Sequence, residues 1–181
     1  MIITQARLED IDSILELHKK YHVNTVSEED KPDGFITTDF TPEQLKGLIG
    51  EDGITIIKDG DSVLGYAMAA SWQFWSEWPF FANMIKLLPD NSFEGTVLDM
   101  ENSYQYGPIT LDKSIRGTGM FEKLFNASLK NMSKRYPIMV TFINQINDRS
   151  YVAHTEKVPM EVISTFVFNN NDYYMLACPT K

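Results

Sequence analysis

Residues Ser114–Phe125 read SIRGTGMFEKLF, and this stretch decides the fold. It passes from two close glycines, Gly117 and Gly119, into apolar residues with helical spacing. Glycine weakens a helix interior, so a glycine pair just before a helix indicates a turn. The first turn of a helix leaves backbone N–H groups unpaired, and together with the helix dipole they suit a phosphate group. We therefore expect a phosphate-binding turn here, with Arg116 as a forked, charged donor.

A plainer interpretation of the same residues stays open. An ordinary strand-to-helix turn with a solvated arginine would also carry two glycines. Neither the GxxxxGK[ST] nor the GxGxxG phosphate motif occurs in the chain, so the turn alone does not decide between the two.

Length and composition bound the class of protein. The 181 residues fit one domain, 1–181, and the hydrophobic content of 43% supports a packed globule. The single cysteine, Cys178, excludes an internal disulfide framework and suits a reducing compartment, so we expect a cytoplasmic protein. The first residues lack a basic start, and no stretch approaches the roughly 18 apolar residues of a membrane helix, so we expect no secretory signal and no membrane contact.

The formal charge of −9 disfavours nucleic acid as a partner, because non-specific binding to phosphates needs a basic surface. An acidic surface favours a cationic partner or serves solubility alone.

The remaining patterns alternate between strands and helices. Apolar runs predict strands at 2–6, 108–112 and 138–144, and hairpins at 53–71 and 161–178. Helices are predicted at 8–22, at 41–49, from the glycine turn to about 136, and at 149–157. The polar region 24–40, broken by KPDG, predicts a loop or short-helix connection. This order predicts a mixed α/β (α+β) domain with one central β-sheet.

The glycine turn resembles the acetyl-coenzyme A loop of the GNAT superfamily of N-acetyltransferases. Their pattern is Gln/Arg-x-x-Gly-x-Gly/Ala, placed after a strand and before a helix. Arg116 and Gly119 match it at the right spacing, whereas Phe121 replaces the final small residue.

A second stretch is similar to another GNAT segment, Asn-x-x-Ser, helix, Lys-x-Gly-Phe and hairpin. Asn147, Ser150 and Lys157 fit it, and Pro159-Met160 stands in place of Gly-Phe. The specific likeness covers about residues 106–177, whereas the N-terminal half matches only in its order of elements.

The resemblance implies the GNAT fold, a single central mixed β-sheet flanked by helices and splayed beside the strand that holds the coenzyme. It implies acetyl-CoA as cosubstrate, while the possibility of a homodimer comes from the aromatic residues within 72–81. The residues implied for the pantetheine arm are Ile109, Thr110, Leu111 and Asp112. Those implied for the pyrophosphate are Arg116, Gly117, Thr118, Gly119, Met120 and Phe121. Asn147 and Ser150 would face the coenzyme from the next strand–helix junction, although helix capping alone would explain both.

The implied reaction transfers an acetyl group to a primary amine of a small molecule or peptide within a ternary complex. The departing thiolate needs a proton, and many GNAT enzymes use a tyrosine for this. At that slot the chain has His154 or Thr155, with Tyr151 one turn earlier, so His154 and Tyr151 are both candidates. The base candidates precede the coenzyme strand, namely Asp99, Glu101 and Tyr104. The alternative function is a non-catalytic acyl-CoA-binding sensor or interaction module of the same fold.

Two further stretches have competing interpretations. The aromatic residues within 72–81 would form core, a dimer face or a wall for the acceptor. His18 and His22 lie one helical turn apart, but no Glu or Cys completes a metal set, so we expect a surface helix and no metal site.

Overall fold

The computed structural model describes residues 1–31 and 34–181; Pro32 and Asp33 of the expected connection lie outside the described residues. The helices, in chain order, are η1 (Leu8–Asp10), α1 (Ile11–Lys20), α2 (Pro42–Gly50), α3 (Trp72–Trp75), α4 (Pro79–Leu87), η3 (Leu88–Asp90), η4 (Lys113–Ile115), α5 (Met120–Met132) and α6 (Asp148–Glu156). The strands are β1 (Ile2–Gln5), β2 (Ile54–Asp59), β3 (Ser62–Ala70), β4 (Ser92–Phe93), β5 (Thr96–Val97), β6 (Ser103–Leu111), β7 (Ile138–Asn144), β8 (Glu161–Phe168) and β9 (Asn171–Pro179).

The chain forms two compact units. Unit 1 contains Met1–Ala69 and Gly107–Asn131, and unit 2 contains Ala70–Tyr106 and Met132–Lys181. One boundary falls inside β6, so this strand contributes its N-terminal half to unit 2 and its C-terminal half to unit 1. The single domain expected from the sequence stays a prediction.

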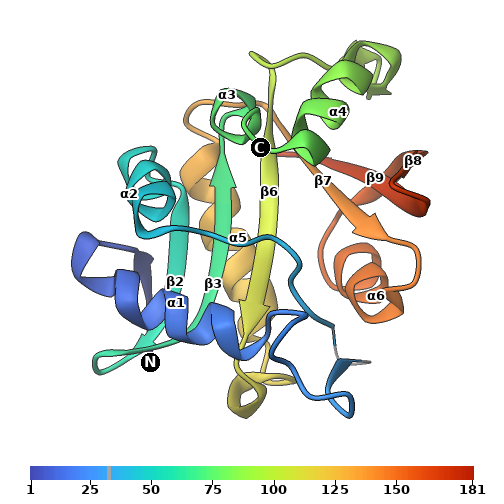
Figure 1. Ribbon diagram of the computed structural model, residues 1–181. Coiled ribbons are helices and arrows are strands. Elements are labelled where there is room, and N and C mark those ends of the chain that lie inside the picture. Colours follow the sequence, from blue (N-terminus) through green and yellow to red (C-terminus); the bar gives the residue numbers. More distant parts are fainter. Residues whose placement is uncertain (32–33) are drawn as a thin grey trace. The chain divides into compact units, whose positions relative to one another are not determined.

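Unit 1 is built on β1, β2 and β3, which pair antiparallel. The C-terminal half of β6 lies beside β3, and the Asp112 N–H, just after the strand, donates to the Leu64 carbonyl at 2.7 Å. Figure 1 shows α1 and α2 on one face of these strands and α5 on the other. The glycine turn at the start of α5 therefore belongs to unit 1.

Unit 2 is built on the N-terminal half of β6 with β7, β9 and β8. β6 and β7 run parallel, whereas β7 with β9 and β9 with β8 run antiparallel. The parallel register covers only Ser103–Gln105 opposite Ile138–Val140. At the next step the Thr141 hydroxyl, rather than a backbone N–H, donates to the Tyr106 carbonyl at 2.6 Å. The backbone ladder thus gives way to a side-chain contact halfway along β6.

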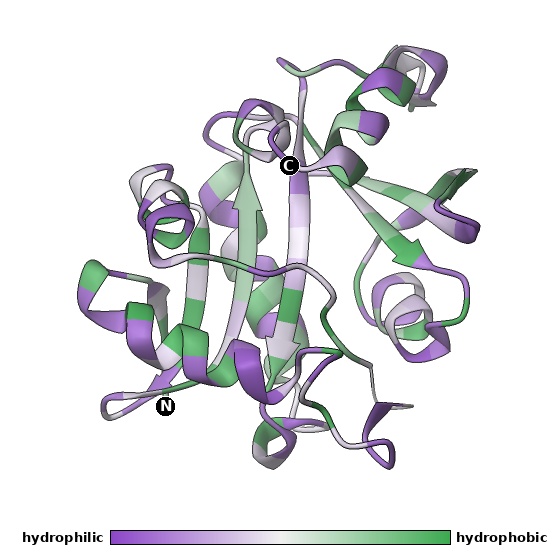
Figure 2. Ribbon diagram, viewed as in Figure 1, coloured by the Kyte–Doolittle hydropathy of each residue, from purple (hydrophilic) through white to green (hydrophobic). Residues whose placement is uncertain are grey.

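The strand order β1-β2-β3-β6-β7-β9-β8 makes one seven-stranded mixed sheet. The mixed α/β class with a central mixed sheet flanked by helices is therefore confirmed. Figure 2 shows hydrophobic residues along β2 and β7, in agreement with strands that are covered on both faces.

Local signals placed several elements correctly. Thr41 caps α2 through its hydroxyl, which accepts the Gln44 N–H at 3.2 Å, while the Gln44 amide returns a bond to the Thr41 N–H at 2.9 Å. Asn169 and Asn170 form the expected turn between β8 and β9, with φ of +47° and +59°. Two positive φ angles in succession match the twist of the paired strands, and asparagine tolerates them.

The strand predicted at 108–112 is wrong at its start, because β6 begins at Ser103. A Gly-Pro pair usually ends a strand. Here Gly107 adopts a φ of +109°, which favours glycine, and the strand continues past Pro108 to Leu111.

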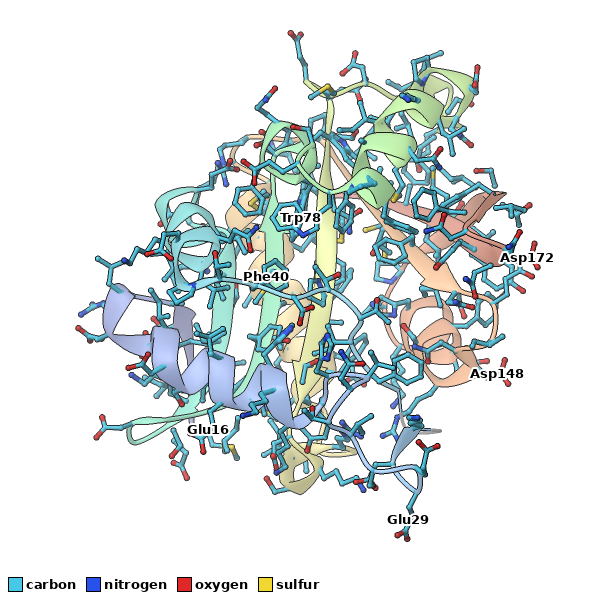
Figure 3. The ribbon with its side chains drawn as sticks, in the orientation of Figure 1. Glu16, Glu29, Phe40, Trp78, Asp148 and Asp172 are labelled. Atoms are coloured by element: carbon cyan, nitrogen blue, oxygen red, sulfur yellow. The ribbon has the colours of Figure 1, made fainter. Side chains whose placement is uncertain are left out.

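α1 has the exposed polar face of the expected surface helix, whereas the side chains of His18 and His22 are buried. His18 Nε2 lies 2.8 Å from the Thr38 carbonyl, which can only accept, so the Tyr66 hydroxyl donates to Nδ1 at 2.7 Å. Phe40 covers the His18 ring edge-on, and Figure 3 shows Phe40 over β3. These histidines pack under the segment before α2 rather than facing water.

The structure confirms the core interpretation for part of the aromatic stretch, whereas the dimer face and the acceptor wall stay predictions. Trp72, Trp75 and Phe81 are buried, as the core interpretation predicts. Trp72 Nε1 donates to the Ser103 hydroxyl at 3.0 Å, which ties α3 to β6 within unit 2. Trp78 and Phe80 are only half-buried, so a surface role is left to these rings.

Within residues 1–31 and 34–181, no helix is both long enough and apolar enough to cross a membrane.

Gly53 sits where a side chain has no room. An added Cβ would lie 2.2 Å from the Ala69 carbonyl oxygen, whereas at Gly50, in the last turn of α2, it would meet nothing within 4 Å. We expect Gly53→Ala to lower the free energy of unfolding by about 3 kcal/mol. Gly50→Ala should leave it unchanged or raise it by up to about 1 kcal/mol. Urea unfolding measures both, and equal effects would contradict the close approach at Gly53.

Candidate functional site

The glycine turn presents its backbone outward. Gly117 and Gly119 have φ of +76° and +77°, a conformation that favours glycine, and a Cβ at either would meet nothing within 4 Å. Gly117, Thr118 and Gly119 are exposed, and no residue in the described part of the chain accepts a hydrogen bond from their N–H groups. Since α5 begins at Met120, these donors lie at a helix N-terminus. The arrangement is that of an anion-binding turn.

Asp112 organises the residues before the turn. Its carboxylate accepts the Ser114 N–H at 3.0 Å and the Ser114 hydroxyl at 2.7 Å, which caps η4. Lys20 of α1 donates to the other carboxylate oxygen at 2.6 Å. Burial raises the pKa of Asp112, but the bonds from Lys20 and Ser114 outweigh burial and hold this pKa well below its usual value. The carboxylate therefore stays charged and paired.

Arg116 contacts residues outside the glycine turn. Its Nε donates to the Leu111 carbonyl at 2.9 Å, and its guanidinium carbon is 4.7 Å from the centre of the Tyr21 ring. The positive charge is thus held at the base of the glycine turn. Direct contact of the guanidinium with a phosphate stays a prediction. In this arrangement the backbone N–H groups are the outward donors.

In unit 2, Asn147 caps α6. Its side-chain oxygen accepts the Ser150 N–H at 3.1 Å. This is the capping role that the sequence left open for the pair. Their contact with the coenzyme stays a prediction.

His154 is a buried, neutral histidine. Its side chain is 4% exposed, and Nδ1 donates to the Ser150 carbonyl at 2.7 Å. Burial lowers the pKa of His154 to about 4, and the hydrogen bond to Ser150 opposes this only in part. At pH 7 the imidazole is therefore unprotonated at Nε2.

The other catalytic candidates lie in unit 2 in different surroundings. Tyr151 is half-buried, with its ring centre 4.9 Å from that of Tyr174. Glu101 is exposed. Asp99 accepts the N–H groups of Glu101 and Asn102 at 2.8 and 2.7 Å, and so caps the turn before β6.

Tyr104 lies within β6 and is fully buried, and burial raises its pKa well above the ordinary value of 10.0. Its hydroxyl therefore stays protonated at neutral pH, which does not suit a general base. Of the three base candidates, Glu101 alone offers an exposed carboxylate that is not the cap of a turn.

Apart from the base candidates around the start of β6, the predicted site residues fall into two groups. Those from Ile109 to Phe121 run continuously through unit 1, and Asn147, Ser150, Tyr151 and His154 share α6 and its cap in unit 2. Sequence reasoning missed Tyr21 and Lys20 of the α1 end, because their partners are about ninety positions away and no local pattern marks them. No group of three or more His, Cys, Asp or Glu side chains among the described residues could hold a metal ion.

Comparison with solved structures shows the same fold in N-acetyltransferases. A ribosomal-protein-alanine N-acetyltransferase from Brucella melitensis is 14% identical with a TM-score of 0.65, and the match covers 99% of both chains. An N-acetyltransferase from Staphylococcus aureus is 19% identical with a TM-score of 0.64, covering 99% of this chain and 98% of that one. A GNAT superfamily phosphinothricin acetyltransferase from Sinorhizobium meliloti, in complex with acetyl-CoA, is 14% identical with a TM-score of 0.64, covering 98% and 87%.

Neither models of protein families nor curated protein sequences gave a match. At 14–19% identity the likeness concerns the fold. This chain has the GNAT fold, as its sequence predicts.

The buried His154 should make stability depend on acid pH. The folded pKa of about 4 lies below the ordinary value of 6.5, so the folded chain binds fewer protons than the unfolded chain between these values. The contribution of neutral His154 is complete above about pH 6.5 and is lost as the pH falls towards 4. Between pH 7 and pH 4, we expect the free energy of unfolding to fall by about 2–3 kcal/mol less in His154→Gln than in the wild type. Urea unfolding from pH 7 to 4 measures it, and parallel pH curves for the two proteins would contradict it.

Proposed function

We propose that the chain is an N-acetyltransferase that transfers the acetyl group of acetyl-CoA to a primary amine of a small molecule or peptide. One observation carries the proposal, namely the exposed turn at Gly117–Gly119 with outward N–H groups at the start of α5. The turn follows β6 in a chain whose fold is that of acetyltransferases. A backbone cradle suits a pyrophosphate, which is acyl-CoA's most highly charged part apart from its terminal phosphate.

The proposed coenzyme contacts follow the strand and the turn. Ile109 to Asp112 would pair with the pantetheine arm as an added strand. The N–H groups of Gly117 to Phe121 would hold the pyrophosphate, with Arg116 supplying positive charge from below. Asn147 and Ser150 would approach from the cap of α6. Asp112 is already neutralised by Lys20, so its carboxylate does not oppose an incoming phosphate with a free charge.

The chemistry proposed is direct attack by the amine. A primary ammonium of pKa about 10.4 must first lose a proton, and the exposed carboxylate of Glu101 is the proposed base, acting directly or through water. The amine lone pair then forms the new C–N bond with the thioester carbon. The C–S bond breaks, and the leaving thiolate takes a proton.

Between the two proposed donors of that proton, the surroundings favour Tyr151. The Nδ1–H of His154 is occupied by the Ser150 carbonyl, and Nε2 of the neutral ring carries no proton. A buried neutral histidine suits positioning of α6 better than proton donation. Tyr151 keeps a hydroxyl on a half-buried side chain.

The second candidate function is a non-catalytic acyl-CoA-binding module of the same fold. The neutral, carbonyl-bound His154 favours it, since one of two proton-donor candidates is engaged in structure. Release of free thiol in the presence of an amine panel separates the two functions.

The proposal also includes a location and an assembly. A protein whose single cysteine cannot form an internal disulfide suits the cytoplasm, and a homodimer is the proposed assembly.

Replacing Gly119 tests the cradle. A valine there would be strained at a φ of +77° and would place a branched Cβ where the phosphate approaches. The melting temperature of the wild type should rise clearly at millimolar CoA. We expect Gly119→Val to raise the Kd for CoA at least about tenfold, as measured by calorimetry.

Gly95→Val is the matched control, because Gly95 has a φ of +80° and open space around its Cβ in the β4–β5 turn. The two variants should lose similar stability, but Gly95→Val should bind CoA as the wild type does. Unchanged CoA affinity in a folded Gly119→Val variant would rule out the turn as the phosphate site.

Replacing the donor candidates tests the chemistry. Because a proton donor acts in the transition state, Tyr151→Phe should lower kcat by about 10²-fold or more while the KM for acetyl-CoA changes little. His154→Gln should lower kcat less than Tyr151→Phe does. Thiol release with the best amine measures both, and a normal kcat in Tyr151→Phe would remove Tyr151 from the mechanism.

A further inference from the structure

Tyr21, at the C-terminal end of α1, contacts the segment that leads into the glycine turn. Its side chain is 3% exposed. The hydroxyl accepts the Lys113 N–H at 2.8 Å and donates to the Asp112 carboxylate at 3.2 Å. The ring lies under the Arg116 guanidinium at 4.7 Å. One side chain from a distant helix therefore touches both ends of η4.

We propose that Tyr21 is a positioning residue for the coenzyme, fixing the glycine turn in the geometry that binds phosphate. This inference rests on the proposed function and assigns a residue that lies outside the predicted coenzyme segments. Tyr21 acts through Asp112, Lys113 and Arg116, and makes no contact with phosphate itself.

The need for such a support follows from the turn's own composition. Gly117 and Gly119 have no side chains that could bond to neighbouring residues. Fixing the backbone of a glycine also costs more conformational entropy than fixing that of any other residue. The Thr118 hydroxyl does bond the Ile115 carbonyl at 2.6 Å, but this bond stays within the loop. Arg116 and η4 therefore determine where the N–H groups of the turn lie. Tyr21 holds both of them against α1.

The two parts of the Tyr21 side chain have separate tasks. The hydroxyl holds the start of η4 by using both its donor and its acceptor capacity. The ring holds Arg116 by a cation–π contact, while the Leu111 carbonyl fixes its Nε. Ion pairs add to this brace from both sides, Lys20 with Asp112 and Lys113 with Asp30. A cradle prepared in this way binds without first having to order itself.

The substitution Tyr21→Phe removes the hydroxyl and keeps the ring, whereas Tyr21→Leu removes both. We expect Tyr21→Phe to raise the Kd for CoA about tenfold, the effect of losing buried hydrogen bonds. Tyr21→Leu should raise the Kd further. Tyr173→Phe is the matched control, because it also loses a hydroxyl bonded to a side chain, that of Asn144, but in unit 2. It should leave the Kd for CoA unchanged.

A donor without phosphates separates positioning from general damage. S-acetylpantetheine carries the thioester and the pantetheine arm but lacks the pyrophosphate and nucleoside. For Tyr21→Phe, kcat/KM should fall about tenfold with acetyl-CoA and by a clearly smaller factor with S-acetylpantetheine, which reaches only the pantetheine segment. Equal losses with both donors, or a wild-type Kd for CoA in Tyr21→Phe, would overturn the inference. Failure of the wild type to bind CoA would instead overturn the proposed function.

Discussion

The parallel pairing of β6 with β7 is the constraint on which the rest of the arrangement depends. Parallel neighbours cannot be joined by a tight turn, so the chain must cross over through a helix, which here is α5. The crossover starts where β6 ends, and the first turn of its helix has unpaired N–H groups. The pairing thus dictates both the place and the polarity of the candidate anion site.

The backbone and the side chains have different roles at the glycine turn. The turn exposes its backbone, because Gly117 and Gly119 carry no side chains and the Thr118 hydroxyl bonds back to the Ile115 carbonyl. Charged and aromatic side chains lie beneath it, with Arg116 on Tyr21 and Asp112 paired to Lys20.

The sequence predicted the elements that depend on local chemistry. The cap at Thr41, the asparagine turn and the glycine turn all follow from the preferences of a few adjacent residues. It did not predict the first half of β6, because Gly107-Pro108 resembles a strand end. It also did not predict the partners of His18, because nothing nearby in the chain shows that Thr38 and Phe40, before α2, cover it. The contacts of Tyr21 join positions about ninety residues apart, which no local pattern records.

The candidate catalytic residues show the same limit. Asn147 and Ser150 were predicted from their likeness to the GNAT Asn-x-x-Ser segment, and the same spacing serves a helix cap, so the sequence could not separate the two roles. The burial that neutralises His154 arises from strands distant in the sequence, including Tyr106 of β6. Residue type suggested a proton donor, whereas the surroundings decide whether the ring has a proton to give.

The distribution of tryptophan gives the two units separate spectroscopic signatures. All three tryptophans, Trp72, Trp75 and Trp78, belong to unit 2, and unit 1 has none. Intrinsic fluorescence therefore follows the surroundings of α3 and α4, while events at the glycine turn are sensed by tyrosines such as Tyr21 and Tyr66. Coincidence of the fluorescence and far-ultraviolet circular dichroism transitions on unfolding becomes a direct test of whether the two units melt as one cooperative body.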